Sequence, residues 1–194
     1  MLSRVAERAY WIGRYLERVE NLARLCNVFD KLFLDLPRST GVGWADVLST
    51  VSDVEPPKYA EGVDPDQAAI EYLLVDPENP GSLISLMGAV RENARTTRDV
   101  LPAEAWLTIN RLALGTRERA DELLNSSTRG RVLSDFVSSC QQVTGLLAGT
   151  MSHGAAYQCV RAGRNLERAD MTTRIIDTGV NLLLSGRDEI VEYD

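Results

Sequence analysis

Apolar and small residues recur at intervals of four and three along the first 36 positions, the spacing that places them on one face of an α-helix. Ser3 is typical of a helix N-cap and Pro37 of a helix stop, so we expect one helix from about Arg4 to Leu36. Such a helix spans on the order of 50 Å. Partner helices must therefore cover its apolar stripe, which consists of Val5, Ala9, Ile12, Leu16, Val19, Ala23 and Cys26.

The rest of the chain also predicts helices, since no segment alternates for long with the period of two that a strand requires. Residues 37–80 favour two short helices, near Trp44–Val51 and from Pro65 to Val75, and Asp64 is the expected cap of the second. Asn79 before Pro80 predicts the next cap. The longer helices are expected at about Pro80–Leu101, Pro102–Leu124, Arg131–Met151 and Ala155–Leu184.

This pattern predicts an all-α fold, an up-and-down helical bundle with long first and last helices. We expect a single helical domain over residues 1–194, in which residues 36–80 form an acidic excursion with short helices that covers the bundle. Residues 155–185 are interpreted as the start of a second repeat half that is truncated.

The net charge of the chain is concentrated in that excursion. The formal net charge is −7, to which residues 1–35 contribute +1, residues 36–80 contribute −7 and residues 81–194 contribute −1. Nucleic-acid binding is therefore not expected, because neutralising phosphates needs a cluster of excess basic side chains. All but two of the 21 basic residues are arginine, the side chain suited to bidentate pairing with carboxylates or phosphates.

Membrane and redox roles are not indicated. No apolar run approaches the roughly 20 residues that cross a bilayer, and the N-terminus leads into a charged segment rather than a signal peptide. We therefore expect a cytoplasmic protein with no membrane partner. Cys26, Cys140 and Cys159 stand far apart among apolar residues and are interpreted as buried free thiols.

Residues 13–24 and 163–174 resemble each other at an offset of 150 residues. The first segment reads Gly-Arg-Tyr-Leu-Glu-Arg-Val-Glu-Asn-Leu-Ala-Arg, and the second reads Gly-Arg-Asn-Leu-Glu-Arg-Ala-Asp-Met-Thr-Thr-Arg. Six of the twelve positions are identical, and Glu20 is matched by Asp170. The first and last long helices therefore look like copies of one unit.

Each copy places alternating charges on one helix face, because residues three or four apart are neighbours on a helix. Gly13 and Gly163 stand inside helices, where glycine costs about 1 kcal/mol relative to alanine, so we expect another backbone to approach closely at each. Across a pseudo-twofold arrangement, carboxylates of one helix would then pair with guanidinium groups of the other. A weaker echo at Arg91–Arg98 predicts that a third helix contributes to the same polar cluster.

Together with the segments 1–7, 10–21, 76–82, 91–95 and 163–170, these motifs resemble the bacterial alpha-E family over essentially the whole chain. That family is all-helical and has no established biochemical activity. Its genes commonly lie beside those for circularly permuted ATP-grasp ligases and transglutaminase-like proteins. The resemblance therefore implies a role in making or modifying a peptide, with a protein partner of one of these two kinds.

Two departures from the family's pattern matter. Members usually continue with a second repeat half after the second motif, whereas this sequence stops at Asp194, so we expect a fragment or a natural short form. Met171 stands where the family usually has Asn after the acidic residue, which weakens the second copy as a polar site.

The candidate site is the Glu/Arg cluster of these motifs. Three interpretations stay open: a buried ion network that fixes helix register, a pocket that holds a carboxylate or phosphate and an amine, and a solvated helix surface. The candidate residues are Arg14, Glu17, Arg18, Glu20, Asn21, Arg24, Arg91, Glu92, Asn93, Arg95, Arg164, Glu167, Arg168, Asp170 and Arg174.

Other site chemistry is not indicated. His153, the only histidine, is interpreted as a capping or loop residue, and no Glu-x-x-His pair for a di-metal bundle occurs. The segment 41–43 lacks the rest of a phosphate-binding loop, so we expect no metal and no cofactor. Tyr10, Trp11 and Tyr15 are interpreted as core or interface anchors.

Three functions follow as hypotheses. The first is a non-catalytic helical accessory protein that binds a partner enzyme or its peptide product. The second is an enzyme of peptide modification that uses the Glu/Arg cluster. The third is a structural homo-oligomer that covers an apolar helix face with a second copy. Complete pairing of Glu17, Arg18, Glu92 and Glu167, with no cavity between them, would disfavour catalysis at the cluster.

Overall fold

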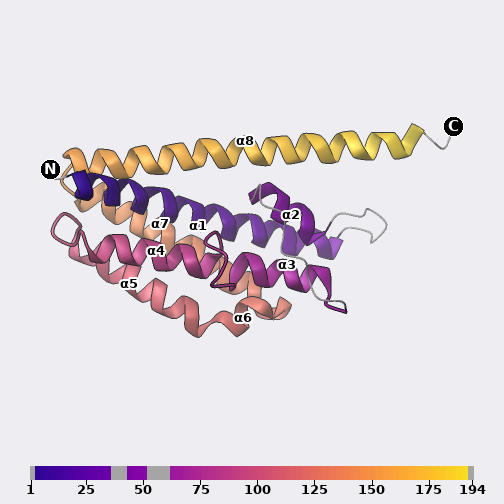
Figure 1. Cartoon of the computed structure of the whole chain (residues 1–194), viewed down its shortest axis with the longest axis horizontal. Helices are drawn as coiled ribbons and strands as arrows, with labels where there is room; N and C mark the ends of the chain where they lie inside the picture. Colours follow the sequence, from indigo (N-terminus) through magenta and orange to yellow (C-terminus); the bar gives the residue numbers. More distant parts are fainter. Residues whose placement is uncertain (1–2, 36–42, 52–61, 192–194) are drawn as a thin grey trace.

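The computed structural model describes residues 3–35, 43–51 and 62–191, and helices are the only regular elements in these three ranges (Figure 1). The predicted all-α, up-and-down bundle with long first and last helices is confirmed. In chain order the helices are α1 (Ser3–Asp35), α2 (Trp44–Val51), α3 (Pro65–Leu74), α4 (Leu83–Arg95), α5 (Ala103–Glu118), α6 (Ala120–Leu124), α7 (Ser126–Thr150) and α8 (Ala155–Val191).

Helix α1 is the centre of the bundle. Helix α8 runs beside it in the same direction, and α4 and α7 pack against it in the opposite direction (Figure 1). The first turns of α1 meet the end of α4, where Arg8 donates to the carbonyl of Thr96 at 3.5 Å. Its last turns meet the start of α7, where Arg129 donates to Asp30 at 2.6 Å. Helices α5 and α6 lie farther out, against α4 and α7.

The apolar stripe of α1 forms one side of the core, as predicted. Every position of the stripe is buried except Val5, which is half-buried. The same core contains Met87 and Val90 of α4 and Phe136 and Val143 of α7. Burial of these side chains between α1, α4 and α7 supplies the main driving force for the bundle.

The predicted short helices of the acidic excursion are confirmed, and they pack on each other, with α3 also against α4 and α6. Asp64 caps α3 as expected, because its carboxylate accepts a hydrogen bond from the amide of Asp66 at 3.1 Å. Helix α2 contacts both α1 and α8, and the hydroxyl oxygens of Thr50 and Thr178 lie 3.1 Å apart. The expected stop at Pro37 lies outside the described residues.

The helix predicted from Pro80 begins later, so the prediction of Asn79 as its cap is wrong. Asn79 instead braces the preceding turn: its Oδ1 accepts from the amide of Gly81 at 2.8 Å, and its Nδ2 donates to the carbonyl of Tyr72 at 2.8 Å. The N-cap of α4 is Ser82, whose hydroxyl accepts from the amide of Ser85 at 3.2 Å.

Three further boundaries differ from the sequence pattern. Helix α4 ends at Arg95 rather than near residue 101, and the hydroxyl of Thr97 donates to the carbonyl of Asn93 at 2.8 Å just past this end. The segment expected as one helix after Pro102 breaks at Arg119 into α5 and α6. Helix α7 begins five residues early, because Asn125 caps it by accepting from the amide of Ser127 at 2.9 Å.

Candidate functional site

Helices α1 and α8 touch at two glycines. A Cβ atom added to Gly13 would lie 2.1 Å from the carbonyl oxygen of Val160, and one added to Gly163 would lie 2.1 Å from the carbonyl oxygen of Tyr10. Any larger residue would therefore push the two backbones apart at this point. The predicted close approach of another backbone at each glycine is confirmed, and it explains why the helices tolerate the cost of glycine in their interiors.

One turn beyond this contact, Glu17 of α1 reaches into the α1–α8 interface. Its carboxylate accepts hydrogen bonds from Nε of Arg164 at 3.1 Å and from Nε and Nη2 of Arg168 at 2.6 and 3.0 Å. The residue is only 3 % exposed. Both oxygens of this buried carboxylate are therefore paired with guanidinium groups of α8.

Glu167 of α8 makes the same contacts in the reverse direction. Its Oε2 accepts from Nε of Arg14 at 2.7 Å and from Nη2 of Arg18 at 2.9 Å, and its Oε1 accepts from Nε of Arg18. The residue is 1 % exposed. The predicted pairing of carboxylates of one helix with guanidinium groups of the other is thus confirmed for both copies of the motif.

These contacts obey a local pseudo-twofold symmetry. Arg14 corresponds to Arg164 and Arg18 to Arg168 at the same offset of 150 that relates Glu17 to Glu167. We call this set of six charged side chains the reciprocal cluster. That α1 and α8 are copies of one ancestral unit, and that residues 155–185 begin a second repeat half, stays a prediction.

The environment of the reciprocal cluster raises the pKa of two of its arginines. The hydrogen bond to Glu17 raises the pKa of Arg168 above its ordinary value, despite partial burial. Burial lowers the pKa of Arg14, but its hydrogen bonds to Tyr10 and Glu167 outweigh that effect and raise it. Arg14 and Arg168 are therefore fixed as cations beside a buried carboxylate.

The next turn of each helix carries an ion pair within the helix. Arg24 donates to buried Glu20 through Nη2 at 2.7 Å, and Arg174 donates to Asp170 through Nε at 3.4 Å. These pairs have the i, i+4 spacing expected on one helix face. Asn21 lies beside them, and its Nδ2 is buried without a hydrogen-bond partner among the described residues.

The third helix does not join the cluster, so that prediction is wrong. Glu92 and Arg95 of α4 form an exposed pair with each other at 2.8 Å. Arg91 donates to Asn110 of α5 at 2.7 Å, and Asn93 donates to a carbonyl of its own helix. The resemblance in sequence does not extend to position, because α4 presents this segment to α5 and the surface rather than to α8.

Hollows flank the reciprocal cluster on both sides. The α7-side hollow, of about 530 Å³, is lined by Glu17, Glu20, Asn21 and Arg24 of α1, Gln141 and Thr144 of α7, and Arg164 and Arg168 of α8. The α2-side hollow, of about 490 Å³, contains the pseudo-symmetric residues Arg18, Glu167, Asp170, Met171 and Arg174. Met171 is buried in the α2-side wall, and that it weakens the second copy as a polar site stays a prediction.

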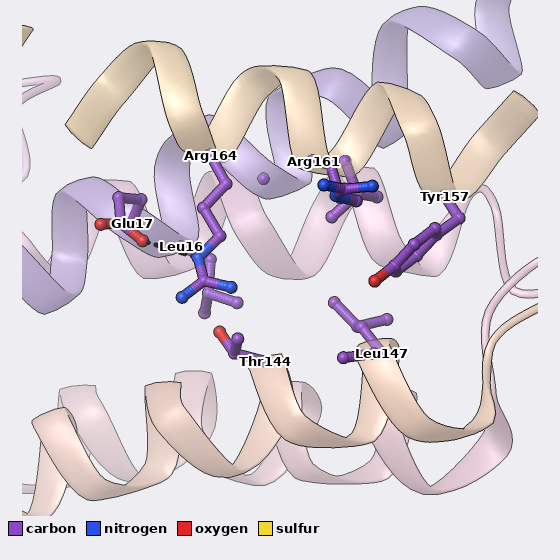
Figure 2. A pocket seen from close by; sticks show the side chains of 10 residues that line it. Leu16, Glu17, Thr144, Leu147, Tyr157, Arg161 and Arg164 are labelled. Carbon is purple, nitrogen blue, oxygen red and sulfur yellow. Dashed lines mark hydrogen bonds and ion pairs between the residues drawn. The ribbon is translucent and has the colours of Figure 1, made fainter. Parts of the chain in front are cut away.

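A small recess continues from the α7-side hollow toward the start of α8. It has a volume of about 30 Å³ and shares Glu17, Thr144 and Arg164 with that hollow. Figure 2 shows Arg164 reaching from α8 toward Thr144 of α7, while Leu16 and Leu147 form the apolar part of the wall.

The other singled-out residues have structural contacts. Nε2 of His153 lies 2.9 Å from the carbonyl of Ala148 in the last turn of α7, and its ring stacks on Tyr157 with centroids 4.1 Å apart. This position confirms the interpretation of His153 as a capping or loop residue. The half-buried Trp11 stacks on Tyr15 with centroids 5.0 Å apart.

The three cysteines are free, and Cys26 and Cys140 are buried as predicted, whereas Cys159 is half-buried. Burial raises the pKa of the Cys26 thiol to about 12 and also raises that of Cys140. Among the residues that the structure describes, no group of three or more His, Cys, Asp or Glu side chains could hold a metal ion. No helix of the same ranges is long and apolar enough to cross a membrane.

Sequence reasoning missed one buried cation, Arg129 of α7. Its Nε and Nη2 donate to the carbonyls of Leu123 and Leu124 at 2.8 and 3.0 Å, and its Nη1 pairs with Asp30. The guanidinium also lies over the ring of Trp44, 5.3 Å from its centroid. Arg129 therefore connects α1, α2, α6 and α7. Its place in the first turn of α7 gave no signal, because that turn was expected to be a loop.

A family model described as "A predicted alpha-helical domain with a conserved ER motif" matches residues 1–193. The chain belongs to the Alpha-E family. Four Glu-Arg dipeptides occur in the sequence, at 7–8, 17–18, 118–119 and 167–168. The second and fourth of these supply both carboxylates and two of the four arginines of the reciprocal cluster.

Curated relatives of this Alpha-E chain occur in mycobacteria. An uncharacterized protein of Mycobacterium bovis is 23% identical over 196 residues, and one of Mycobacterium tuberculosis strain H37Rv is 22% identical over 196 residues. Each match covers 89% of this chain and 22% of the relative, so the chain spans about a fifth of the length of these relatives. No solved structure matches the chain.

Proposed function

We propose that this Alpha-E chain is a non-catalytic helical accessory domain that binds a partner enzyme. In this proposal the Glu/Arg cluster is a structural network that fixes the register of α1 against α8. The partner is a circularly permuted ATP-grasp ligase or a transglutaminase-like protein of a peptide synthesis or modification system, as the resemblance of the sequence implies.

The observation that carries the structural role is the saturation of both buried carboxylates. Glu17 and Glu167 each accept three hydrogen bonds from two arginines. A general acid or base must reach the substrate and exchange a proton with it. A carboxylate held this way between cations is instead suited to holding two helices together.

The observation that supports partner binding is an exposed stripe on the outer face of α8 that consists of three large apolar residues, an alanine and a threonine. Exposed positions recur there at intervals of three and four, and they include Leu166, which is 52% exposed, and Ile176, which is 60% exposed. We call this set the α8 outer stripe; its members are Leu166, Ala169, Thr173, Ile176 and Val180.

The pseudo-twofold relation supports an interaction role for this stripe. The α1 positions 150 residues earlier include Leu16, Val19, Ala23 and Cys26, all buried under α4 and α7. On α8 the corresponding face is open, and α8 continues past the end of α1 (Figure 1). Exposed apolar patches of this kind mark interaction sites, so a helical surface of the partner enzyme is the expected occupant.

The test mixes the purified chain with a purified circularly permuted ATP-grasp ligase, and separately with a purified transglutaminase-like protein, from the same organism. Isothermal titration calorimetry measures binding of the wild type and of the double variant Leu166→Glu, Ile176→Glu. The matched control is Leu107→Glu on α5, a leucine that is 55% exposed but lies outside the stripe.

The proposal expects a saturable complex with one of the two proteins, lost in the α8 double variant and kept in the Leu107 control. Absence of binding to both proteins contradicts it. Light scattering of the chain alone separates the homo-oligomer hypothesis: a wild-type dimer that the α8 variant converts to a monomer assigns the stripe to a second copy instead.

A further inference from the structure

The α7-side hollow has an excess of hydrogen-bond donors that the fold does not use. Arg164 donates to Glu17 only through its Nε. Within the described ranges its two Nη atoms donate to no other group. Nη1 of Arg168 is unused in the same way, since Arg168 donates through Nε and Nη2. The guanidinium groups that fix the helices therefore still present nitrogen donors to the hollow.

A neutral amide adds to this donor set. Nδ2 of Asn21 is buried and has no hydrogen-bond partner among the described residues. An unsatisfied buried donor costs about 1–3 kcal/mol, so such groups commonly have a functional reason. Thr144 lines the same hollow from α7, directly opposite Arg164 (Figure 2).

The charge of the wall indicates the charge of the ligand. Three arginines line the hollow against two glutamates, and both glutamates are already paired with arginines of the wall. The surplus is one positive charge. A monoanion neutralises it, whereas a phosphate dianion would leave an excess negative charge beside buried Glu17 and Glu20.

The adjoining recess indicates the shape of the ligand. Its volume of about 30 Å³ is walled by Leu16, Leu147 and Val160 and meets the hollow at Thr144 and Arg164. This space suits a methyl-sized group next to the donors of the hollow. A large hydrophobic tail would not fit it.

The two sides of the α1–α8 pair differ in the features that matter for an anion. Asn21 on the α7 side is replaced at the equivalent position by Met171 on the α2 side. The α2-side wall also contains Leu48, Val51 and Leu73, where the α7 side has Gln141 and Thr144. The pseudo-symmetric hollow thus serves as an internal comparison: it is lined by Arg18 and Arg174 but has methionine at the position of Asn21, and Nδ2 of its Asn79 already donates to the carbonyl of Tyr72.

We propose that the α7-side hollow binds a small monocarboxylate with a methyl-sized side group. The carboxylate accepts hydrogen bonds from Arg164 and from Asn21 and Thr144, and the side group occupies the recess beside Leu16 and Leu147. This inference goes beyond the accessory role proposed above and does not rest on it, since the hollow and the α8 outer stripe are separate surfaces.

The test is a titration of the 15N-labelled chain, followed by nuclear magnetic resonance, with N-acetyl-L-alanine as the probe. Its neutral N-methylamide and inorganic phosphate are the two comparison ligands. The proposal expects saturable shifts of the Asn21 side-chain amide and of the backbone around Thr144 with N-acetyl-L-alanine. It expects at least about tenfold weaker binding of both comparison ligands.

Two variants remove a neutral donor without touching the reciprocal cluster: Asn21→Met, which copies the residue present at position 171, and Thr144→Val. Each is expected to weaken binding at least about tenfold while the thermal unfolding midpoint stays close to that of the wild type. The matched control is Gln142→Met, because Gln142 neighbours a residue of the hollow but faces the α5 side of α7.

Three outcomes overturn the proposal. The first is the absence of saturable shifts at these residues with the wild type. The second is equal binding of the methylamide or tighter binding of phosphate. The third is wild-type affinity in both donor variants, which would show that the arginines attract any anion without a built site.

Discussion

Glu17 and Glu167 are paired reciprocally across the α1–α8 interface. The two arginines that flank Glu167 on α8 hold the carboxylate of Glu17, and the two that flank Glu17 on α1 hold the carboxylate of Glu167. The same offset of 150 places Gly13 against Val160 and Gly163 against Tyr10. The glycines bring the two backbones together, and the charged groups pair one turn further along. A one-turn slip of α8 would leave each buried carboxylate with one arginine instead of two, because the paired arginines stand four residues apart.

The glycine contact predicts that alanine substitutions here destabilise the chain, whereas Gly→Ala in an ordinary helix interior stabilises it. Gly13→Ala and Gly163→Ala should each destabilise the chain by about 1–3 kcal/mol, because the new methyl group meets a carbonyl oxygen of the partner helix. This outweighs the gain in helix propensity of about 1 kcal/mol. Urea unfolding followed by circular dichroism measures the difference.

The matched control for these substitutions is Gly145→Ala on α7. Nothing lies within 4 Å of a Cβ built at this exposed position, so only the propensity gain remains. We expect stabilisation by about 0.5–1 kcal/mol. A stabilised Gly13→Ala variant would contradict the close approach of the two helices.

Neutralising one carboxylate of the reciprocal cluster should also destabilise the fold. Glu17→Gln and Glu167→Gln each leave two arginines without a counter-charge, and we expect a loss of about 1–3 kcal/mol. The value stays below that of a fully buried pair because the arginines are partly exposed to solvent.

Glu92→Gln is the surface comparison for these two variants. Its carboxylate is exposed and pairs only with Arg95 of its own helix. We expect its midpoint of urea unfolding to match that of the wild type within the error of the measurement. An equal loss at Glu92 and Glu167 would show that the cross-helix geometry has no special role.

The sequence predicted this contact well because the information is local to two helices. A repeated Gly-Arg-x-Leu-Glu-Arg pattern fixes which face carries the charges, and helical spacing then fixes which residues are neighbours. Two interior glycines with no turn chemistry around them indicated a close backbone approach. The partner helix could be inferred because the two copies of the repeat lie on the two helices that form the interface, α1 and α8.

The errors arose where local pattern competes with tertiary position. Arg91–Arg98 matches the motif in sequence, but the helix that carries it turns this segment toward α5 and the surface. Asn79 has the chemistry of a cap but uses it within the preceding turn. The network of Arg129 was out of reach, because its partners come from three other helices that only the fold brings together.

The corrected start of α4 predicts the effect of removing its cap. Ser82→Ala should destabilise the chain by about 1 kcal/mol, because the amide of Ser85 loses its acceptor and the hydroxyl it replaces is buried. Ser138→Ala is the control, since its exposed hydroxyl bonds only within α7 and should change stability by less than about 0.5 kcal/mol. Thermal unfolding separates the two cases.

The cysteines should differ in reactivity in the folded chain. With a chromogenic disulfide reagent at about pH 8, we expect one fast-reacting thiol, the half-buried Cys159, because Cys26 and Cys140 are buried. The Cys159→Ser variant should show no fast phase, and unfolding in urea should make all three thiols reactive. Fast reaction in Cys159→Ser would contradict the burial of the other two.

The same burial sets a pH dependence for Cys26. Its pKa is raised from 9.0 to about 12 in the folded chain, so the folded state holds the proton more tightly than the unfolded state. Its contribution to stability is complete below about pH 9 and is lost as the pH rises from there. Cys26→Ala should make the alkaline decline in the free energy of unfolding shallower, and the decline that remains includes the contribution of Cys140, whose pKa burial also raises.

The two Glu-Arg motifs stabilise the bundle by pairing with each other across α1 and α8. A double-mutant cycle with Glu17→Gln and Arg168→Gln measures that coupling in the free energy of unfolding. We expect a coupling between Glu17 and Arg168 of about 1–3 kcal/mol, as for charged groups that share a hydrogen-bonded network. A coupling below about 0.3 kcal/mol would contradict it, because the two residues would then act as independent surface charges.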